Sequence, residues 1–406
     1  MTQVFAFNLR HLDAVLAIRK RGSISAASDD ANLSQPALTQ ALAKLERQLG
    51  HRLFDRQTTG AVPTPAGTRF LERVQRAIEY LIDGGGQVRR SIKAPALPHF
   101  ERMVSLGQLR AISTVAHAGS YVAAAREIGA AQPSLHRAVK ELELVLGVPL
   151  LVRAGRTMRA TTAAHRLVRS IRLAIAELQA GLDALAELSQ AGAGTVTIGT
   201  LPLARAVLLP QALARFMANH QHATVRIVEA PYEQLLVDVL EGNIDLLIGA
   251  LREDQPIDGV IQQRLFAEGV SIVAGRHHPL AGGGTPTLDE LARHPWVVGA
   301  RGAPTRRHWE HLFPGNDGPR PVTRVESASA MLTRGLLLAG DWLAMMSSDQ
   351  FHIEREAGLI VALGDTLPGT SRWIGITTRS DWWPTDTQAA FLETLSASAA
   401  ARSSGN

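Results

Sequence analysis

The chain has 406 residues, no cysteine and a formal net charge of +5. This length predicts two to four domains with sizeable cores, and the absence of cysteine excludes disulfides, thiolate metal sites and cysteine nucleophiles. The first residues place their basic cluster after the apolar ones and offer no small-residue cleavage site, and no run of 18 apolar residues follows. We therefore expect neither a signal peptide nor a membrane span, and a cytoplasmic protein.

Charge is distributed unevenly along the chain. Lys and Arg outnumber Asp and Glu by 14 to 8 in residues 1–99 and by 11 to 7 in residues 100–194, whereas residues 195–406 carry 17 against 22. The basic N-terminal half predicts nucleic-acid binding, and the acidic C-terminal half predicts a different function for that part of the chain.

A helix is predicted within Asn32–Gly50, with Ser34 suited to the N-cap, Pro36 to the first turn and Gly50 to the C-terminal stop. One stripe of this helix is apolar and consists of Leu38, Leu42, Leu45 and Leu49. A short Ala-rich helix over Ser25–Ala31 precedes it closely, so the two helices must turn sharply. This is the pattern of a helix-turn-helix, whose second helix reads a DNA groove.

The outward side of the second helix carries groups that suit DNA. Gln35, Thr39 and Gln40 can form hydrogen bonds with base edges. The nearby cations that suit phosphates are Lys44, Arg47, Arg52 and Arg56. An ordinary amphipathic helix with a solvated polar face is the alternative from this helix alone.

An ordered series of short motifs runs through residues 8–67: LRHL, GS followed by AA, SQPAL, LE and LG, LFDR, and TPAG. In this series the chain resembles the N-terminal DNA-binding domain of LysR-type transcriptional regulators. The resemblance implies a winged helix-turn-helix domain that binds double-stranded DNA. It also implies that the protein responds to a small-molecule effector and associates with itself as a dimer or tetramer.

The same motifs recur 97 residues later without a gap. Sixty pairs from Asn8–Gly67 and Ser105–Ala164 contain 19 identities, and the apolar stripe returns as Leu135, Val139, Leu142 and Leu146. Such a repeat predicts two helix-turn-helix units in one chain.

The two copies differ on the side that would face DNA. Thr39, Gln40, Ala43, Lys44 and Arg47 are replaced by His136, Arg137, Lys140, Glu141 and Leu144, and the Ser34 cap becomes Ala131. Each copy continues into a strand-turn-strand segment, over 52–63 and 149–160, and the second is basic. A second DNA reader and a decayed or dimerising duplicate both remain open. The candidate DNA-binding residues of both copies are Ser34, Gln35, Pro36, Thr39, Gln40, Lys44, Arg52, Arg56, Gln132, Pro133, His136, Arg137 and Arg153.

A long helical pattern follows each copy. The first stops at Gly84-Gly85-Gly86, before a linker with Pro95 and Pro98, and the second runs over 165–190 and ends at Gly192-Ala193-Gly194. The resemblance implies that the second helix pairs with its counterpart in another subunit. A helical partner within the same chain is the alternative.

From Thr195 short apolar strands alternate with helical stretches, which predicts a parallel sheet flanked by helices. The order of elements resembles the two-lobed effector-binding domain of the same family, which shares its fold with periplasmic binding proteins. The predicted fold is therefore multidomain: two all-α winged helix-turn-helix domains with long linker helices (1–93 and 100–191), then an α/β domain (195–400). Its lobe I covers about 195–267 and 371–400, and lobe II about 268–370.

Ligands of such folds bind between the lobes, at strand ends where helices begin. The candidate effector residues there are Thr200, Leu201, Pro202, Ala250, Thr305 and Ser327. Hydroxyls and free N–H groups suit an anion or a polyhydroxylated compound. Helix capping is the alternative for the hydroxyl residues.

No catalytic pattern emerges from the sequence. His308 and His311 beside Glu310 lack a third ligand at a recognisable spacing, and neither a nucleophile elbow nor a phosphate-binding glycine loop occurs. We expect no enzyme, no metal and no cofactor, but a ligand-responsive, sequence-specific transcriptional regulator. The alternative is a small-molecule binding protein whose helix-turn-helix repeats serve in assembly.

Overall fold

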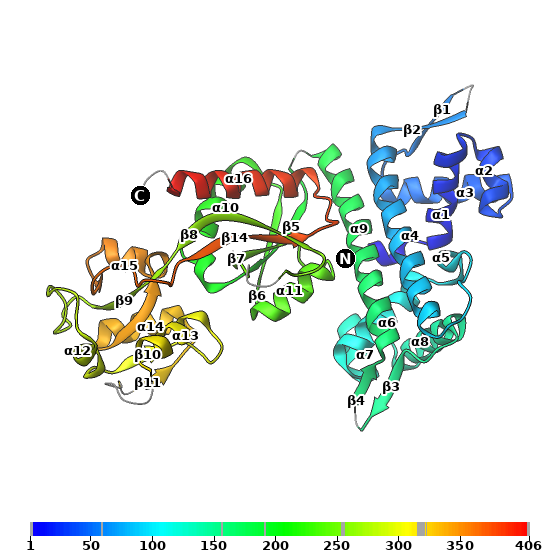
Figure 1. Cartoon of the computed structure of the whole chain (residues 1–406). Helices are drawn as coiled ribbons and strands as arrows, with labels where there is room; N and C mark the ends of the chain where they lie inside the picture. Colours follow the sequence, from blue (N-terminus) through cyan, green and yellow to red (C-terminus); the bar gives the residue numbers. More distant parts are fainter. Residues whose placement is uncertain are drawn as a thin grey trace.

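The computed structural model describes residues 3–57, 60–155, 157–190, 192–252, 256–314, 321 and 323–403. The chain is elongated (Figure 1), with two helical units at one end, one sheet in the middle and a second sheet at the other end. Among the described helices, none is long and apolar enough to cross a membrane.

The two helical units repeat each other element by element. The first comprises η1 (Val4–Ala6), α1 (Leu9–Arg21), α2 (Ile24–Ala31), α3 (Gln35–Leu49), β1 (Phe54–Gln57), β2 (Gly60–Pro63) and α4 (Pro65–Ser91). The second comprises α5 (Phe100–Met103), α6 (Leu106–Ala118), α7 (Tyr121–Ile128), α8 (Gln132–Leu146), β3 (Leu151–Ala154), β4 (Thr157–Ala160) and α9 (Thr162–Ser189). From α1 to β2, every element of the first unit has its counterpart 97 residues further on.

Burial of the apolar stripes explains the packing of both units. Leu38, Leu42 and Leu45 are at most 5% exposed, and their side of α3 packs on α1 and α2. Ser34 caps α3 by accepting a hydrogen bond from the Ala37 N–H, and Gly50 ends it in the left-handed conformation. In the second unit, α8 packs on α6 and α7 in the same way.

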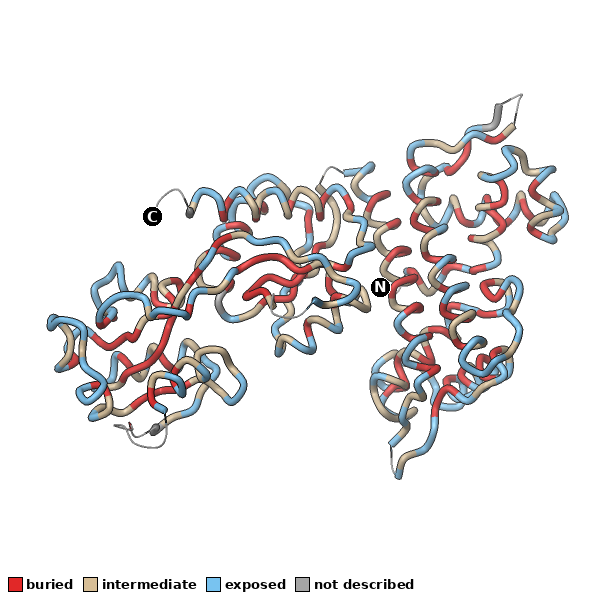
Figure 2. Tube along the Cα trace, in the orientation of Figure 1, coloured by how far each residue is buried: buried red, intermediate tan, exposed pale blue. Residues whose placement is uncertain are grey.

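The long helices α4 and α9 run antiparallel and pack along most of their length (Figures 1 and 2). The expectation that the first long helix stops at Gly84-Gly85-Gly86 is wrong, because α4 continues to Ser91. Gly84 and Gly85 are buried, and a Cβ on Gly84 would lie 2.6 Å from the Cβ of Ser170 on α9. These glycines let two helices approach closely and do not end one.

The middle sheet has the order β6-β5-β7-β14-β8. Its elements are β5 (Thr195–Thr200), η2 (Pro202–Arg205), α10 (Leu208–Asn219), β6 (Thr224–Glu229), α11 (Tyr232–Leu240), β7 (Leu246–Ala250), β8 (Val260–Glu268), β14 (Arg372–Arg379) and α16 (Asp386–Ser403). The first three strands are parallel, as expected, but β14 runs antiparallel to β7 and β8. The sheet is therefore mixed.

The far sheet has the order β11-β10-β12-β9-β13. Its elements are β9 (Val270–Gly275), α12 (Leu288–Ala292), β10 (Trp296–Val298), α13 (Pro304–Leu312), β11 (Thr323–Glu326), α14 (Ala330–Ala339), β12 (Leu343–Ser347), η3 (Ser348–Phe351), α15 (His352–Glu356) and β13 (Ile360–Ala362). The chain passes between the sheets twice, from β8 to β9 and from β13 to β14. Two crossings of this kind are typical of domains whose lobes move as bodies about a common hinge.

Candidate nucleic-acid interface and effector cleft

The outward side of α3 is exposed in the described part of the chain. Gln35, Pro36, Gln40 and Lys44 are exposed. Thr39 is half-buried, and its hydroxyl donates a hydrogen bond of 2.9 Å to the Gln35 carbonyl. The amides of Gln35 and Gln40 thus retain their hydrogen-bonding capacity for a partner outside the chain.

The wing of the first unit is fixed by a carboxylate. Glu46 Oε1 accepts the Leu53 N–H at 2.7 Å and the Phe54 N–H at 3.4 Å. Arg52, just before β1, is exposed, and the backbone of Arg56 lies in β1 while its side chain falls outside the description. The position of the wing relative to α3 is therefore set by hydrogen bonds to the backbone.

The second helix-turn-helix unit has the same arrangement of helices and a different outer surface. No side chain caps α8 at Ala131, which agrees with the loss of serine there. The residues predicted to face DNA are all exposed: Gln132, Pro133, His136, Arg137 and Arg153. The His136 ring lies 5.2 Å from that of Tyr121, Lys140 forms an ion pair with Glu143, and Leu144 is 81% exposed.

The cleft between the two sheets holds a cavity of about 670 Å³. Five of the six candidate effector residues line it: Leu201, Pro202, Ala250, Thr305 and Ser327. Thr200 does not, since it is 1% exposed and its hydroxyl donates to the Leu201 carbonyl. Thr305 does not cap α13, whose N-cap is Ala303, whereas Ser329 caps α14 by accepting from the Leu332 N–H.

Sequence reasoning missed the cationic part of this cavity. Its arginines come from four separate segments and are Arg205, Arg252, Arg301 and Arg372. Arg205 pairs with Glu229, and the Arg252 guanidinium lies 4.6 Å from the ring centre of Tyr232. Within the described part of the chain no hydrogen bond or ion pair engages the Arg372 guanidinium, whose pKa is lowered by burial although the nearby charge of Glu268 acts in the opposite direction. No spacing in the sequence signals such a group, because only the fold brings the four segments together.

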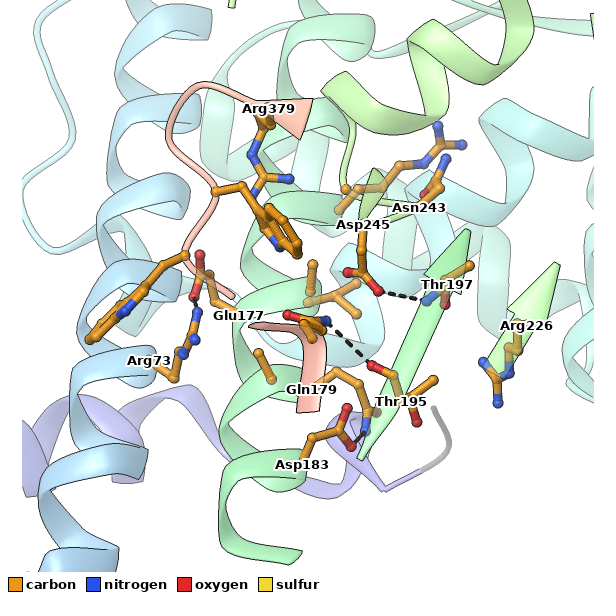
Figure 3. A pocket seen from close by; sticks show the side chains of 18 of the residues that line it. Arg73, Glu177, Gln179, Asp183, Thr195, Thr197, Arg226, Asn243, Asp245 and Arg379 are labelled. Carbon is orange, nitrogen blue, oxygen red and sulfur yellow. Dashed lines mark hydrogen bonds and ion pairs between the residues drawn. The ribbon is translucent and has the colours of Figure 1, made fainter. Parts of the chain in front are cut away.

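A buried network joins the helical units to the middle sheet. Glu177 of α9 accepts a hydrogen bond of 2.9 Å from Arg73 of α4 (Figure 3). It accepts a second one, also of 2.9 Å, from Arg76 of the same helix. The same two arginines donate to the carbonyls of Pro384 and Asp381, in the segment between β14 and α16. The Glu177 carboxylate therefore connects α9 to α4, and the two arginines extend the network to the effector-side domain.

Beside this network lies a second cavity, of about 230 Å³. Asp245 lines it and accepts the Thr197 N–H at 2.7 Å (Figure 3). Burial, followed by the nearby charge of Asp183, raises the pKa of Asp245 to about 7. A carboxyl group at the junction thus titrates in the neutral range.

Two winged helix-turn-helix units followed by a two-lobed domain with an open cleft define the architecture of a ligand-sensing transcriptional regulator. The model of the LysR substrate binding domain matches residues 189–400. The model of the bacterial regulatory helix-turn-helix protein, lysR family, matches twice, at 9–68 and 106–165. The chain belongs to the LysR family of transcriptional regulators, and its internal repeat is a confirmed duplication of the family's helix-turn-helix.

Curated relatives and solved structures agree with this assignment. The chain is 33% identical over 380 residues to the HTH-type transcriptional regulator GalR of Pseudomonas putida, covering 92% of each chain. It is 26% identical to the regulator PcaQ of Agrobacterium fabrum over 70% of this chain and 91% of that one. In fold it is similar to a full-length OxyR variant of Pseudomonas aeruginosa (TM-score 0.51, 22% identity, 73% of this chain and 94% of that one). LysG of Corynebacterium glutamicum gives a TM-score of 0.52 at 19% identity, over 72% and 97%.

Neither solved chain accounts for more than 73% of this one, although each is itself covered to 94% or more. The remainder agrees with the presence of an additional helix-turn-helix unit with its linker helix. α9 packs on α4 of the same chain, so the alternative of a partner within the same chain holds, and the implied pairing of α9 with another subunit remains a prediction.

Proposed function

We propose that this regulator binds duplex DNA through the outward side of α3 and responds to a small anionic effector held between its lobes. The observation that carries the DNA-binding part is the contrast between the two sides of α3. Leu38, Leu42 and Leu45 are buried in the core, while Gln35 and Gln40 are exposed, and no described residue forms a hydrogen bond with the side-chain amide of either. Such amides recognise adenine through two hydrogen bonds in the major groove.

The remaining candidates divide into positioning and reading roles. Lys44 and Arg52 are exposed beside the reading amides and suit phosphates, and Arg56 belongs to the same proposal on sequence grounds. Ser34 acts first as the cap of α3, so its hydroxyl fixes the start of the helix that approaches the groove.

The effector proposal rests on charge and on helix ends. Arginines from four segments surround the cavity, against the carboxylates of Glu229 and Glu233. The helices α13 and α14 also begin at its wall, where their N–H groups favour negative charge. A carboxylate bound near Arg372 would give this guanidinium the hydrogen-bonded partner that no described residue supplies.

Effector binding would close the lobes about their two connecting strands, and the movement would reach the helical units through the segment between β14 and α16. Asp381 of that segment accepts a 2.5 Å hydrogen bond from the Tyr80 hydroxyl on α4. The domain limits 1–93, 100–191 and 195–400 belong to this proposal, as do self-association and a cytoplasmic location. It includes no catalysis, and the described residues hold no cluster of three or more metal-ligating side chains.

A mobility-shift assay with genomic fragments at rising salt tests the proposal. We expect one or few fragments to bind tightly at low salt, with affinity falling steeply as salt rises because phosphate contacts release counterions. A protein that prefers no fragment, but that gains thermal stability with small carboxylates, would be the alternative: a ligand-binding protein whose helix-turn-helix units serve in assembly.

A further inference from the structure

The helices α4 and α9 meet with an approximate two-fold symmetry inside one chain. A Cβ on Gly181 of α9 would lie 3.1 Å from the Phe70 ring of α4, and a Cβ on Gly84 of α4 would lie 3.5 Å from Leu167 of α9. Leu167 stands 97 residues after Phe70, and Gly181 stands 97 after Gly84. Contacts that exchange in this way define an isologous interface, the kind that joins the two subunits of a symmetric dimer.

The ends of the interface repeat this exchange with different chemistry. At one end Arg102 forms a 2.6 Å ion pair with Asp13 of α1. At the other end, Arg110 lies 4.6 Å from the ring centre of Phe5. Arg102 and Arg110 occupy the positions that Phe5 and Asp13 hold in the first copy, 97 residues earlier. An ion pair on one side thus corresponds to a cation–π contact on the other.

Because of this divergence, the first copy is complementary to the second copy, whereas pairing of two identical copies is unfavourable. If two first copies were paired, Phe5 would face Asp13 at both ends and neither carboxylate would have its arginine. If two second copies were paired, Arg102 would face Arg110, and like charges repel.

The centre of the interface discriminates more strongly. The positions of Arg73 and Glu177 correspond to Ser170 and Tyr80 in the other copy. Two second copies would therefore leave Glu177, 3% exposed, without its arginines. A buried charge without a partner is strongly unfavourable, so the pairing of a first copy with a second copy is specified, and in this chain α4 and α9 form that pair.

We propose, on the basis of the DNA-binding function above, that one chain is a complete two-reader unit and binds one bipartite DNA site whose two half-sites differ in sequence. The α3 reader presents amides and a hydroxyl. The α8 reader presents His136 and Arg137, and Arg137 is exposed and suits the bidentate contact with guanine. Different readers held in a symmetric frame require a site that is symmetric in spacing but not in sequence.

The experiment is a selection of tight-binding duplexes from a randomised 40-base-pair library by the full-length protein, followed by native mass spectrometry of the complex. We expect two unequal half-sites about one helical turn apart, roughly 34 Å. The ratio of chains to duplexes should be one to one, so that an assembly held together by other surfaces should bind one duplex for each of its chains. Replacing the second half-site with an inverted copy of the first should weaken binding about tenfold.

Variants assign each reader to its half. Gln35→Ala should relax base preference in one half-site and Arg137→Ala in the other, and both side chains are exposed, so folding is preserved. Gln48→Ala, on α3 but outside the reading residues, is the control. Two chains on a palindromic duplex, or an Arg137→Ala variant with unchanged preference in both halves, would overturn the inference while leaving DNA binding intact. Selection of no duplex at all would refute the proposed function itself.

Discussion

Arg73 of α4 and Glu177 of α9 form a 2.9 Å ion pair in which the side chains are only 6% and 3% exposed. The other oxygen of Glu177 accepts from Arg76, and the Arg73 guanidinium lies 4.5 Å from the ring centre of Trp383. One buried carboxylate therefore joins the linker helices of the two helix-turn-helix units, and the arginines that bind it also contact the segment leading into α16.

Removing that carboxylate should destabilise the pairing of the two units. For Glu177→Ala we expect a loss of about 3 to 5 kcal/mol, since two arginines remain without their partner. Urea denaturation followed by circular dichroism measures it. Asp83→Asn on α4 is the matched control, because the Asp83–Arg90 pair is exposed and worth at most about 1 kcal/mol. Equal effects of the two changes would contradict the role given to Glu177.

The glycines of α4 offer a second test. Ala in place of Gly usually stabilises a helix by about 0.5 to 1 kcal/mol, and Gly86→Ala should behave so, since its Cβ would meet only the tip of Arg90, at 3.4 Å. Gly84→Ala should destabilise instead, because its Cβ would lie 2.6 Å from Ser170. Thermal unfolding of both variants measures the two effects. Stabilisation by Gly84→Ala would mean that α4 and α9 are less closely packed at this position than the structure indicates.

Replacement of Gln35 should reduce specific DNA binding. We expect Gln35→Ala to lose about 1 to 3 kcal/mol of binding free energy for the preferred fragment and little for unrelated DNA, because base contacts carry specificity. Competition mobility shifts measure both. A uniform loss for all sequences would assign Gln35 to positioning on the backbone.

Arg372 should control the response to anionic ligands. In a thermal-shift screen of small carboxylates with the full chain, we expect a stabilising compound whose effect disappears in Arg372→Gln. Arg293→Gln, on an exposed residue outside the cavity, should respond like the unmodified protein. A hit that stabilises Arg372→Gln equally would place the effector away from this arginine.

Asp245 should make stability depend on pH between about 4 and 7. Its pKa rises from 3.8 to about 7 on folding, so the folded state holds the proton more tightly and loses stability as pH rises through this range. The full shift corresponds to about 4 kcal/mol, and we expect on the order of 2 because the carboxyl group still reaches a cavity. Unfolding of Asp245→Asn at pH 5 and pH 8 should show a smaller difference than that of the unmodified protein.

Local patterns in the sequence predict a structural feature correctly where that feature depends on residues of a single helix or strand. Ser34 and Gly50 mark the ends of α3, and the leucine spacing marks its core side. The role of Gly84 in helix packing does not follow from the local pattern, which predicts a helix end. That role depends on Ser170, 86 residues away in the chain and on another helix. The arginines of the cleft could not be predicted for the same reason. Arg205 and Arg372 are far apart in the sequence, and only the complete fold places both of them at the wall of the same cavity.

Duplication within one chain also changes how such a regulator can evolve. In a homodimer one codon specifies the same residue in both readers, so any new base preference appears in both halves of the operator at once. In the proposed two-reader unit, Gln35 and Gln132 are encoded by separate codons, so a single mutation would alter the contact with one half-site and leave the contact with the other unchanged. The two helix-turn-helix units and their half-sites could therefore change one at a time, without a stage at which the contacts with both half-sites are lost.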